Sequence, residues 1–147
     1  MNKIKYIFFF VAFFSVFSCV KEEPLYTIPF APVYFRIDIN GLDSDLTHFT
    51  YKKYLSGRTI GEQVGYSGLL VFRDSEGEIF AFDLCCPQED SREIRVEPED
   101  NGEAACPVCG NRYVFWTGTG HEVSGGESLQ KYQVLGTTQS GVFHIRN

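Results

Sequence analysis

Short stretches in which apolar and polar residues alternate recur along the chain, and this pattern is typical of β-strands. Residues 33–37 alternate in this way and end at an Asn-Gly turn, so they predict a half-buried strand. Residues 69–72 and 78–84 flank the polar turn 73–77 and predict a β-hairpin. Further short strands are predicted near residues 49–54, 94–96, 112–116, 132–135 and 142–145. Many short strands separated by turns indicate an all-β fold, an antiparallel β-sandwich or small barrel.

The first eighteen residues have the pattern of an export signal. Lys3 and Lys5 precede the apolar stretch 6–17, which is too short to cross a bilayer core that needs about 20 residues of helix. Val16-Phe17-Ser18-Cys19 resembles a bacterial lipobox, in which the cysteine becomes the lipid-bearing first residue of the mature protein. Cys19 is therefore the expected lipid anchor. An ordinary secretory signal, with Cys19 unmodified, is the alternative.

These features divide the chain into three parts: a lipoprotein signal peptide (1–18), a lipid-anchored tether (19–32) and a β domain (33–147). The tether contains three prolines and no sustained periodicity, which indicates an extended segment. Residues 21–23 after the anchor resemble a charged signal that directs some lipoproteins to the outer face of the outer membrane. The expected location is therefore the cell envelope, at the outer membrane and on its surface. The expected partners are the lipid bilayer and a protein of the envelope.

Composition and charge narrow the classes of function. The chain has 147 residues, of which 16% are aromatic, and it contains 14 glycines and five cysteines, which favours a β protein with thiol or metal chemistry. Its formal charge of -6 becomes -8 when Lys3 and Lys5 leave with the signal peptide. Nucleic-acid binding needs clustered Lys and Arg, so a nucleic-acid partner is excluded. The sequence also has no recognisable Ser-His-Asp arrangement, phosphate loop or paired-carboxylate motif.

Four of the five cysteines belong to two turns that each follow a strand. Cys85 and Cys86 end the predicted hairpin, and because successive strand side chains point to opposite faces, both join one site only if the chain bends at Pro87. Residues 106–110 form a Cys-x-x-Cys-Gly motif with the spacing of a metal knuckle, in which Gly110 permits the backbone N–H groups to approach the sulfurs. A strand follows this motif, whereas a helix follows it in thioredoxin-like redox sites.

The two turns resemble the loops of Rieske-type domains, which supply Cys-x-His from one loop and Cys-x-x-His followed by Gly from the other. The resemblance covers residues 66–147 and is carried by residues 81–83, Cys86-Pro87, Cys106-Pro107-Val108-Cys109-Gly110, Tyr113, Thr117 and Gly118. It implies a Rieske-like fold with a rubredoxin-like, two-loop metal-binding subdomain at residues 85–135.

The sequence departs from the Rieske pattern at both histidine positions. Gln88 stands at the first and Cys109 at the second, whereas a Rieske cluster binds one iron through two Cys and the other through two His. The expected site therefore consists of Cys86, Cys106 and Cys109, with Cys85 as a conditional fourth thiol and Gln88 at the altered histidine position. Three chemical states stay open: disulfides without metal, Zn or another single metal ion, and a [2Fe-2S] cluster completed by Cys85 or Gln88.

The expected function is that of a membrane-anchored, Rieske-like binding or accessory module whose cysteine loops are closed by disulfide or Zn, with no catalysis of its own. One alternative is an electron-transfer protein with an atypically ligated [2Fe-2S] cluster, acting as a component of an oxidoreductase. Another is a thiol oxidoreductase that uses Cys106 and Cys109, which requires a low-pKa thiolate at one of them.

Other residues suited to binding are expected to have structural or surface roles. The three histidines, His48, His121 and His144, are expected at the surface, with only His121 near the cysteine loops. Tyr113, Phe115 and Trp116 are expected to pack a core, because aromatic residues in strands usually do so.

Overall fold

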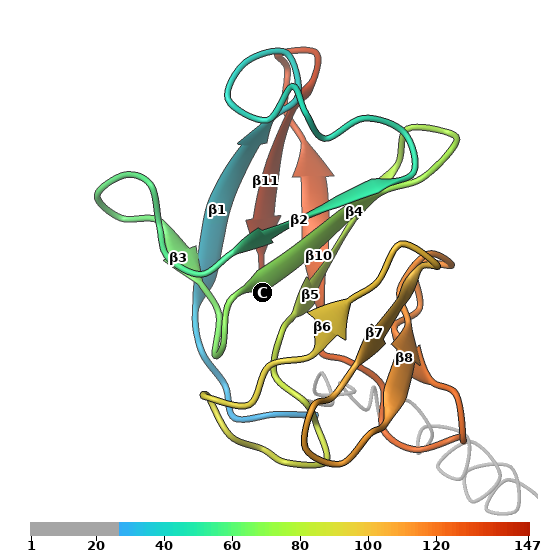
Figure 1. Cartoon of the computed structure of the whole chain (residues 1–147). Coiled ribbons are helices and arrows are strands. Elements are labelled where there is room, and N and C mark those ends of the chain that lie inside the picture. The colour runs from blue at the N-terminus through green and yellow to red at the C-terminus, as the bar shows by residue number, and fades with distance from the viewer. Residues whose placement is uncertain (1–26) are drawn as a thin grey trace, which may run out of the picture.

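The computed structural model describes residues 27–147, which form antiparallel strands in two sheets (Figure 1). The larger sheet has the strand order β2-β4-β5-β10-β11-β1-β3, and the smaller has the order β6-β7-β8-β9. The strands of the larger sheet are β1 (Val33–Asp38), β2 (Thr50–Tyr54), β3 (Gln63–Val64), β4 (Leu69–Arg73), β5 (Ile79–Asp83), β10 (Lys131–Gly136) and β11 (Val142–Arg146). Those of the smaller sheet are β6 (Glu97–Pro98), β7 (Glu103–Ala105), β8 (Arg112–Val114) and β9 (His121–Glu122).

The β4–β5 hairpin separates two hydrophobic cores. Leu69 and Val71 of β4 point into the first core, which the curled larger sheet encloses, while Leu70 and Phe72 point into the second. Both faces of β4 are therefore buried, which explains why this strand is continuously apolar rather than alternating. β1 has only one buried face, and it alternates.

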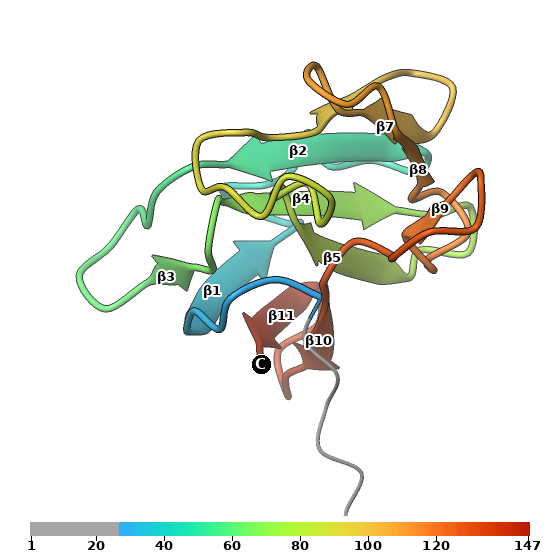
Figure 2. The same cartoon turned by 90° about the horizontal axis from the view of Figure 1, so that it is seen from below.

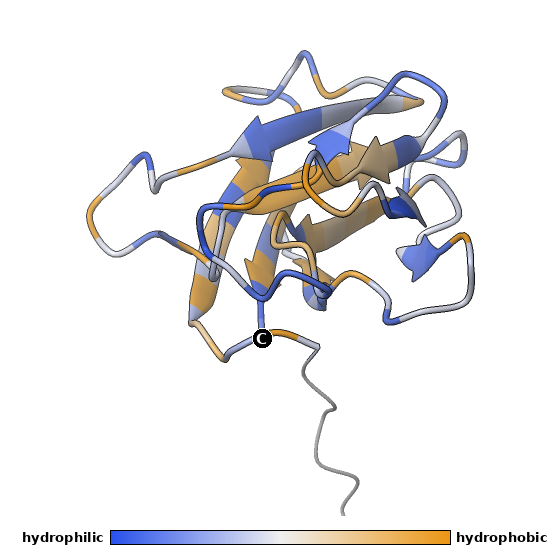
Figure 3. Ribbon diagram, turned by 60° about the horizontal axis from the view of Figure 1, so that its bottom comes forward, coloured by the Kyte–Doolittle hydropathy of each residue, from blue (hydrophilic) through white to orange (hydrophobic). Residues whose placement is uncertain are grey.

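The second core lies between β4–β5 and the cysteine-bearing part of the chain. Figure 2 shows β2, β4 and β5 between the smaller sheet on one side and β1, β10 and β11 on the other. Cys86 and Cys106 belong to this core together with Tyr113 and Phe115. Hydrophobic residues concentrate in the central strands of the larger sheet, whereas its edge strand β2 and the short strands of the smaller sheet are mostly hydrophilic (Figure 3). The second core thus positions both cysteine loops against the larger sheet.

The predicted all-β fold with a two-loop cysteine subdomain is confirmed, and so is the predicted hairpin, which pairs Leu69 with Asp83 and Arg73 with Ile79. The expected strand at 94–96 is wrong: the structure has a single bridge there, between Arg95 and Cys85. This segment pairs with the first cysteine loop instead of entering the smaller sheet, because the Val96 N–H donates to the Leu84 carbonyl.

The buried carboxylate of Asp83, at the end of β5, holds the start of the first cysteine loop. Its Oδ1 accepts hydrogen bonds from the N–H groups of Ser67 (3.0 Å) and Cys85 (2.8 Å). Its Oδ2 accepts from the Tyr66 N–H (2.7 Å) and the Tyr132 hydroxyl (2.8 Å). Burial raises the pKa of Asp83 although all four donors oppose this shift. One side chain therefore fixes β5, β10, the segment before β4 and the cysteine loop relative to one another.

The first described residues pack against the domain. Ile28 and Ala31 are buried, the Thr27 N–H donates to Gln130 Oε1 at 3.1 Å, and Asn147 Nδ2 donates to the Ala31 carbonyl at 3.2 Å. The signal peptide (1–18), Cys19 and the tether up to residue 26 lie outside the described residues. Within residues 27–147, no helix could span a bilayer.

Removal of the Asp83 carboxylate is expected to lower the free energy of unfolding by about 3–5 kcal/mol, because Asp83→Ala leaves several buried donors without an acceptor. Tyr132→Phe removes one of the four hydrogen bonds and is expected to cost about 1 kcal/mol. Urea unfolding followed by circular dichroism measures both. Equal losses in the two variants would contradict a clamping role for the carboxylate.

Candidate metal centre

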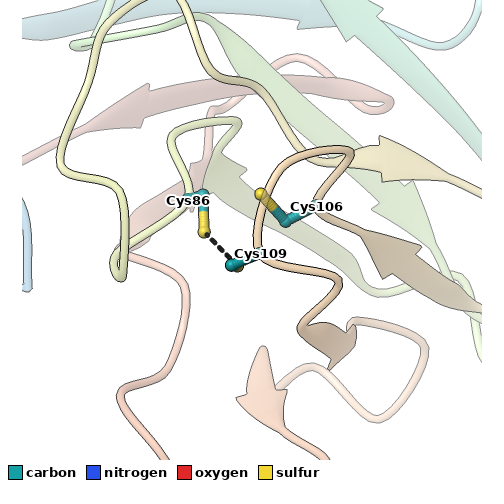
Figure 4. A group of neighbouring side chains, drawn as sticks. All are labelled: Cys86, Cys106 and Cys109. Carbon is teal, nitrogen blue, oxygen red and sulfur yellow. Dashed lines mark hydrogen bonds between the residues drawn. The ribbon is translucent and has the colours of Figure 1, made fainter.

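Three cysteine sulfurs from two loops meet at one point. Cys86 lies in the loop that follows β5, and Cys106 and Cys109 lie in the loop between β7 and β8 (Figure 4). The three Sγ atoms all lie within 4.8 Å of one another, and the Cys86 and Cys109 sulfurs are 3.6 Å apart. Cys86 and Cys106 are buried, whereas Cys109 is exposed. The site therefore lies at the edge of the second core and opens to solvent at Cys109.

The backbone of residues 106–110 has the form of a metal knuckle. The Cys106 N–H donates to the Asn111 carbonyl at 2.8 Å, and the Gly110 N–H donates to the Cys106 carbonyl at 3.1 Å. Gly110 has a φ of +77°, in the left-handed region that glycine adopts without strain. This turn directs the N–H groups of Val108 and Cys109 at the Cys106 sulfur. The local sequence thus supplies two backbone N–H donors to the Cys106 thiolate.

The thiols of the knuckle differ in acidity. Burial alone would raise the pKa of Cys106, but hydrogen bonds from the Cys109 and Val108 N–H groups hold it below its ordinary value. Desolvation and the neighbouring thiols of Cys106 and Cys86 raise the pKa of Cys109 to about 12. The metal-free site therefore stabilises a first thiolate at Cys106 and resists further ionisation. A divalent cation would remove this resistance by neutralising the clustered charge.

Cys85 does not join the three sulfurs. Its Sγ lies 3.5 Å from the Ser91 carbonyl oxygen and 3.6 Å from the Cys86 carbonyl oxygen, and the side chain is fully buried. Burial raises the pKa of this thiol to about 11. The alternation that separates neighbouring strand side chains therefore holds at this position, and Cys85 is a buried structural thiol.

Gln88, two residues after Cys86, is exposed. It borders a cavity of about 340 Å³ together with Pro87, Asn111, Tyr113 and Glu122. No sequence motif predicts a role for Glu122. Its carboxylate accepts hydrogen bonds from the backbone N–H groups of Ser124 and Gly126, so it shapes the loop that borders the cavity.

Tyr113 contacts the cysteine site from the core. Its hydroxyl lies 3.3 Å from the Cys86 sulfur, and the side chain is only 1% exposed. Burial raises the pKa of this phenol, so it stays protonated and can donate to a thiolate. Tyr113 and Phe115 are core residues, as the sequence predicts, whereas Trp116 is 50% exposed.

No histidine joins the sulfurs in the part of the chain that the structure describes. His121 is exposed, and its Nδ1 lies 2.7 Å from the Thr119 hydroxyl. His48 is exposed as well, and the His144 ring lies 5.5 Å from that of Tyr34.

The sulfur geometry fits one tetrahedral metal ion. With metal–sulfur bonds of about 2.3 Å, tetrahedral coordination places sulfurs about 3.8 Å apart, and the Cys86–Cys109 separation of 3.6 Å is close to this value. A binuclear cluster divides its ligands into pairs on two irons and requires a fourth ligand, which Cys85 does not supply in this arrangement. All four cysteines of residues 27–147 are free thiols. The donor set, three thiolates with one position left over, suits Zn.

Comparisons with known proteins give distant structural matches only. No family model matches the chain, and no curated protein matches it. A protein described as an NADH-dependent nitrite reductase small subunit from Mycobacterium tuberculosis is 13% identical, covers 80% of this chain and 96% of its own, and has a TM-score of 0.46. The ferredoxin of carbazole 1,9a-dioxygenase from Nocardioides aromaticivorans is 15% identical, covers 76% and 96%, and has a TM-score of 0.43. At this level of similarity, no cofactor or activity is transferred to the chain.

Alkylation is expected to separate Cys85 from the knuckle thiol Cys106. In folded, metal-free protein at pH 8, iodoacetamide is expected to modify Cys106 well before Cys85, because the pKa of Cys106 lies below its ordinary value whereas a pKa of about 11 leaves Cys85 almost entirely protonated. Mass spectrometry of timed digests measures the order. In denaturant all four thiols are expected to react alike, and early modification of Cys85 in the folded protein would contradict its assignment.

Proposed function

We propose that this chain is an exported, lipid-anchored binding or accessory domain, built on a Rieske-like scaffold, in which Cys86, Cys106 and Cys109 bind one Zn ion. The observation that carries the proposal is the mutual approach of three sulfurs from two separate loops. Support for the scaffold comes from the two facing cysteine loops and the adjoining antiparallel sheet.

The surroundings of the sulfurs suit a bound metal ion that joins the two loops. When bound, Zn supplies a cross-link between two loops that are distant in sequence, and it adds its binding free energy to folding. The residues of the chain prepare this cross-link: Asp83 fixes the start of the first loop, and the knuckle N–H groups stabilise the Cys106 thiolate. Tyr113, which contacts the Cys86 sulfur, also lines the cavity at Gln88.

An accessory rather than catalytic role is supported by the structural use of one carboxylate at that cavity. Glu122 accepts hydrogen bonds from two backbone N–H groups, which lower its pKa and commit the carboxylate to holding the loop. An electron-transfer protein with a [2Fe-2S] cluster is the alternative. It requires a rearrangement that brings in Gln88 or Cys85 as a fourth ligand.

Metal analysis of anaerobically prepared protein tests the site. We expect about one Zn per chain. Cys106→Ser is expected to lower the affinity for Zn at least about 100-fold, because loss of a direct ligand weakens binding more than loss of a residue that only hydrogen-bonds to a ligand, which costs about 10–100-fold. Cys85→Ser is the matched control and should keep its Zn. Two irons with two labile sulfides per chain would establish the electron-transfer alternative, and metal-free protein without free thiols would establish the disulfide form.

Lipid attachment is tested at Cys19. The wild-type protein is expected to incorporate labelled palmitate and to enter the detergent phase of a Triton X-114 extract, whereas Cys19→Ser should remain unlabelled. Proteolysis of intact cells tests exposure at the outer surface. Unchanged labelling of Cys19→Ser would refute the anchor, and protection from protease in intact cells would refute surface exposure.

A further inference from the structure

A groove lined by aromatic residues is formed by residues of β2 and β4, the β6–β7 turn and the two residues after β8, and none of the cysteines lines it. Its volume is about 580 Å³, which is within the range of small-molecule sites. Phe49, just before β2, and Trp116, after β8, flank it, and the turn 99–102 between β6 and β7 closes one side. We call this feature the aromatic groove.

The rings of the aromatic groove form a connected series. The Phe49 and Phe72 centroids lie 6.5 Å apart, those of Phe72 and Phe115 5.4 Å apart, and those of Phe115 and Tyr51 5.6 Å apart, all in edge-to-face geometry. Phe72 and Phe115 are buried and form the floor. Phe49 is 64% exposed and Trp116 is 50% exposed, so aromatic surface is available to a ligand.

The chain holds these rings in place by close backbone contacts. A Cβ atom on Gly102, whose φ is +83°, would lie 2.6 Å from Cδ1 of Trp116, so the indole packs directly on the glycine backbone. Phe49 has a φ of +60°, which is rare for a bulky residue, and its N–H donates to the Arg73 carbonyl at 2.8 Å. The Tyr51 hydroxyl donates to the Pro98 carbonyl at 3.1 Å. The groove is therefore preformed.

The charges around the aromatic groove are negative. Glu99 and Asp100 line it, and no Lys or Arg among the described residues does so. Arg112 pairs with Glu99, but Asp100 takes part in no ion pair within residues 27–147. Aromatic faces carry partial negative charge and attract cations, so the rings and the Asp100 carboxylate favour the same kind of ligand.

We propose that the aromatic groove binds an alkylated ammonium ion of the choline type. Its methyl groups can contact the rings, while its positive charge interacts with the ring faces and with Asp100. A primary ammonium is more strongly hydrated and loses more on leaving water. A neutral sugar stacked on Trp116 is the rival occupant. The proposal does not depend on the metal site.

Fluorescence of Trp116, the only tryptophan of the chain, reports on the groove directly. With full-length protein in a polyoxyethylene detergent at fixed ionic strength, choline is expected to produce a saturable change. Its neutral isostere 3,3-dimethyl-1-butanol is expected to bind about 10-fold more weakly, the ratio typical of a cation–π contact. Saturation-transfer NMR on the choline methyl protons provides a second readout.

Two variants and two matched controls locate the site. Phe49→Ala and Asp100→Asn are each expected to weaken choline binding about 5–10-fold. Tyr34→Ala, an exposed aromatic on β1, and Glu76→Gln, an exposed carboxylate in the β4–β5 turn, should leave it unchanged. Asp100 is exposed, so its variant keeps the test informative if Phe49→Ala does not fold. Equal binding of the isostere, saturable binding of methyl glucoside instead of choline, or no saturable choline response would overturn the proposal.

Discussion

The hydrogen bonds accepted by the buried Asp83 carboxylate are the constraint on which the arrangement of this molecule depends. They connect segments that are far apart in sequence, with Tyr132 lying 49 residues from Asp83. Because the Cys85 N–H is one of the donors, the first cysteine loop leaves β5 in a fixed direction. The next residue, Cys86, is thereby placed in the second core. Because four donors from separate segments bind this buried carboxylate, disturbing any one of these segments leaves a buried polar group unsatisfied. The geometry of the first cysteine loop therefore depends on the packing of the other segments.

The cysteine site is continuous with the second hydrophobic core. Cys86 and Cys106 pack among residues of both sheets, and Tyr113 contacts the Cys86 sulfur from within that core. Close packing keeps the three sulfurs together even though ionising all of them would place like charges in contact. The same arrangement lowers the pKa of Cys106 and raises the pKa of Cys109, because the knuckle stabilises one thiolate and opposes the formation of a second.

Sequence patterns predict those parts of the fold that depend on local order. Alternation in β1 and the polar turn between β4 and β5 predict both elements, and alternation also predicts that Cys85 and Cys86 face apart. Strands β3 and β9 have two residues each and β7 has three, which is too short for any periodicity to be detected. The roles of Asp83 and Glu122 depend on partners that only tertiary folding brings together. Trp116 is expected in the core from the sequence, but it packs on the backbone of Gly102 at the surface, a contact that no sequence pattern predicts.

The cysteine site and the aromatic groove share one structural support. Strand β8 begins just after the knuckle and ends just before Phe115 and Trp116. The N–H groups of Phe115 and Trp116 both donate to the Gly102 carbonyl, at 3.0 and 3.3 Å, which ties the groove to the β6–β7 turn. The ladder between β7 and β8 joins Ala105, next to Cys106, to Arg112. One short, hydrogen-bonded pair of strands therefore carries the knuckle at one end and the turn that borders the groove at the other.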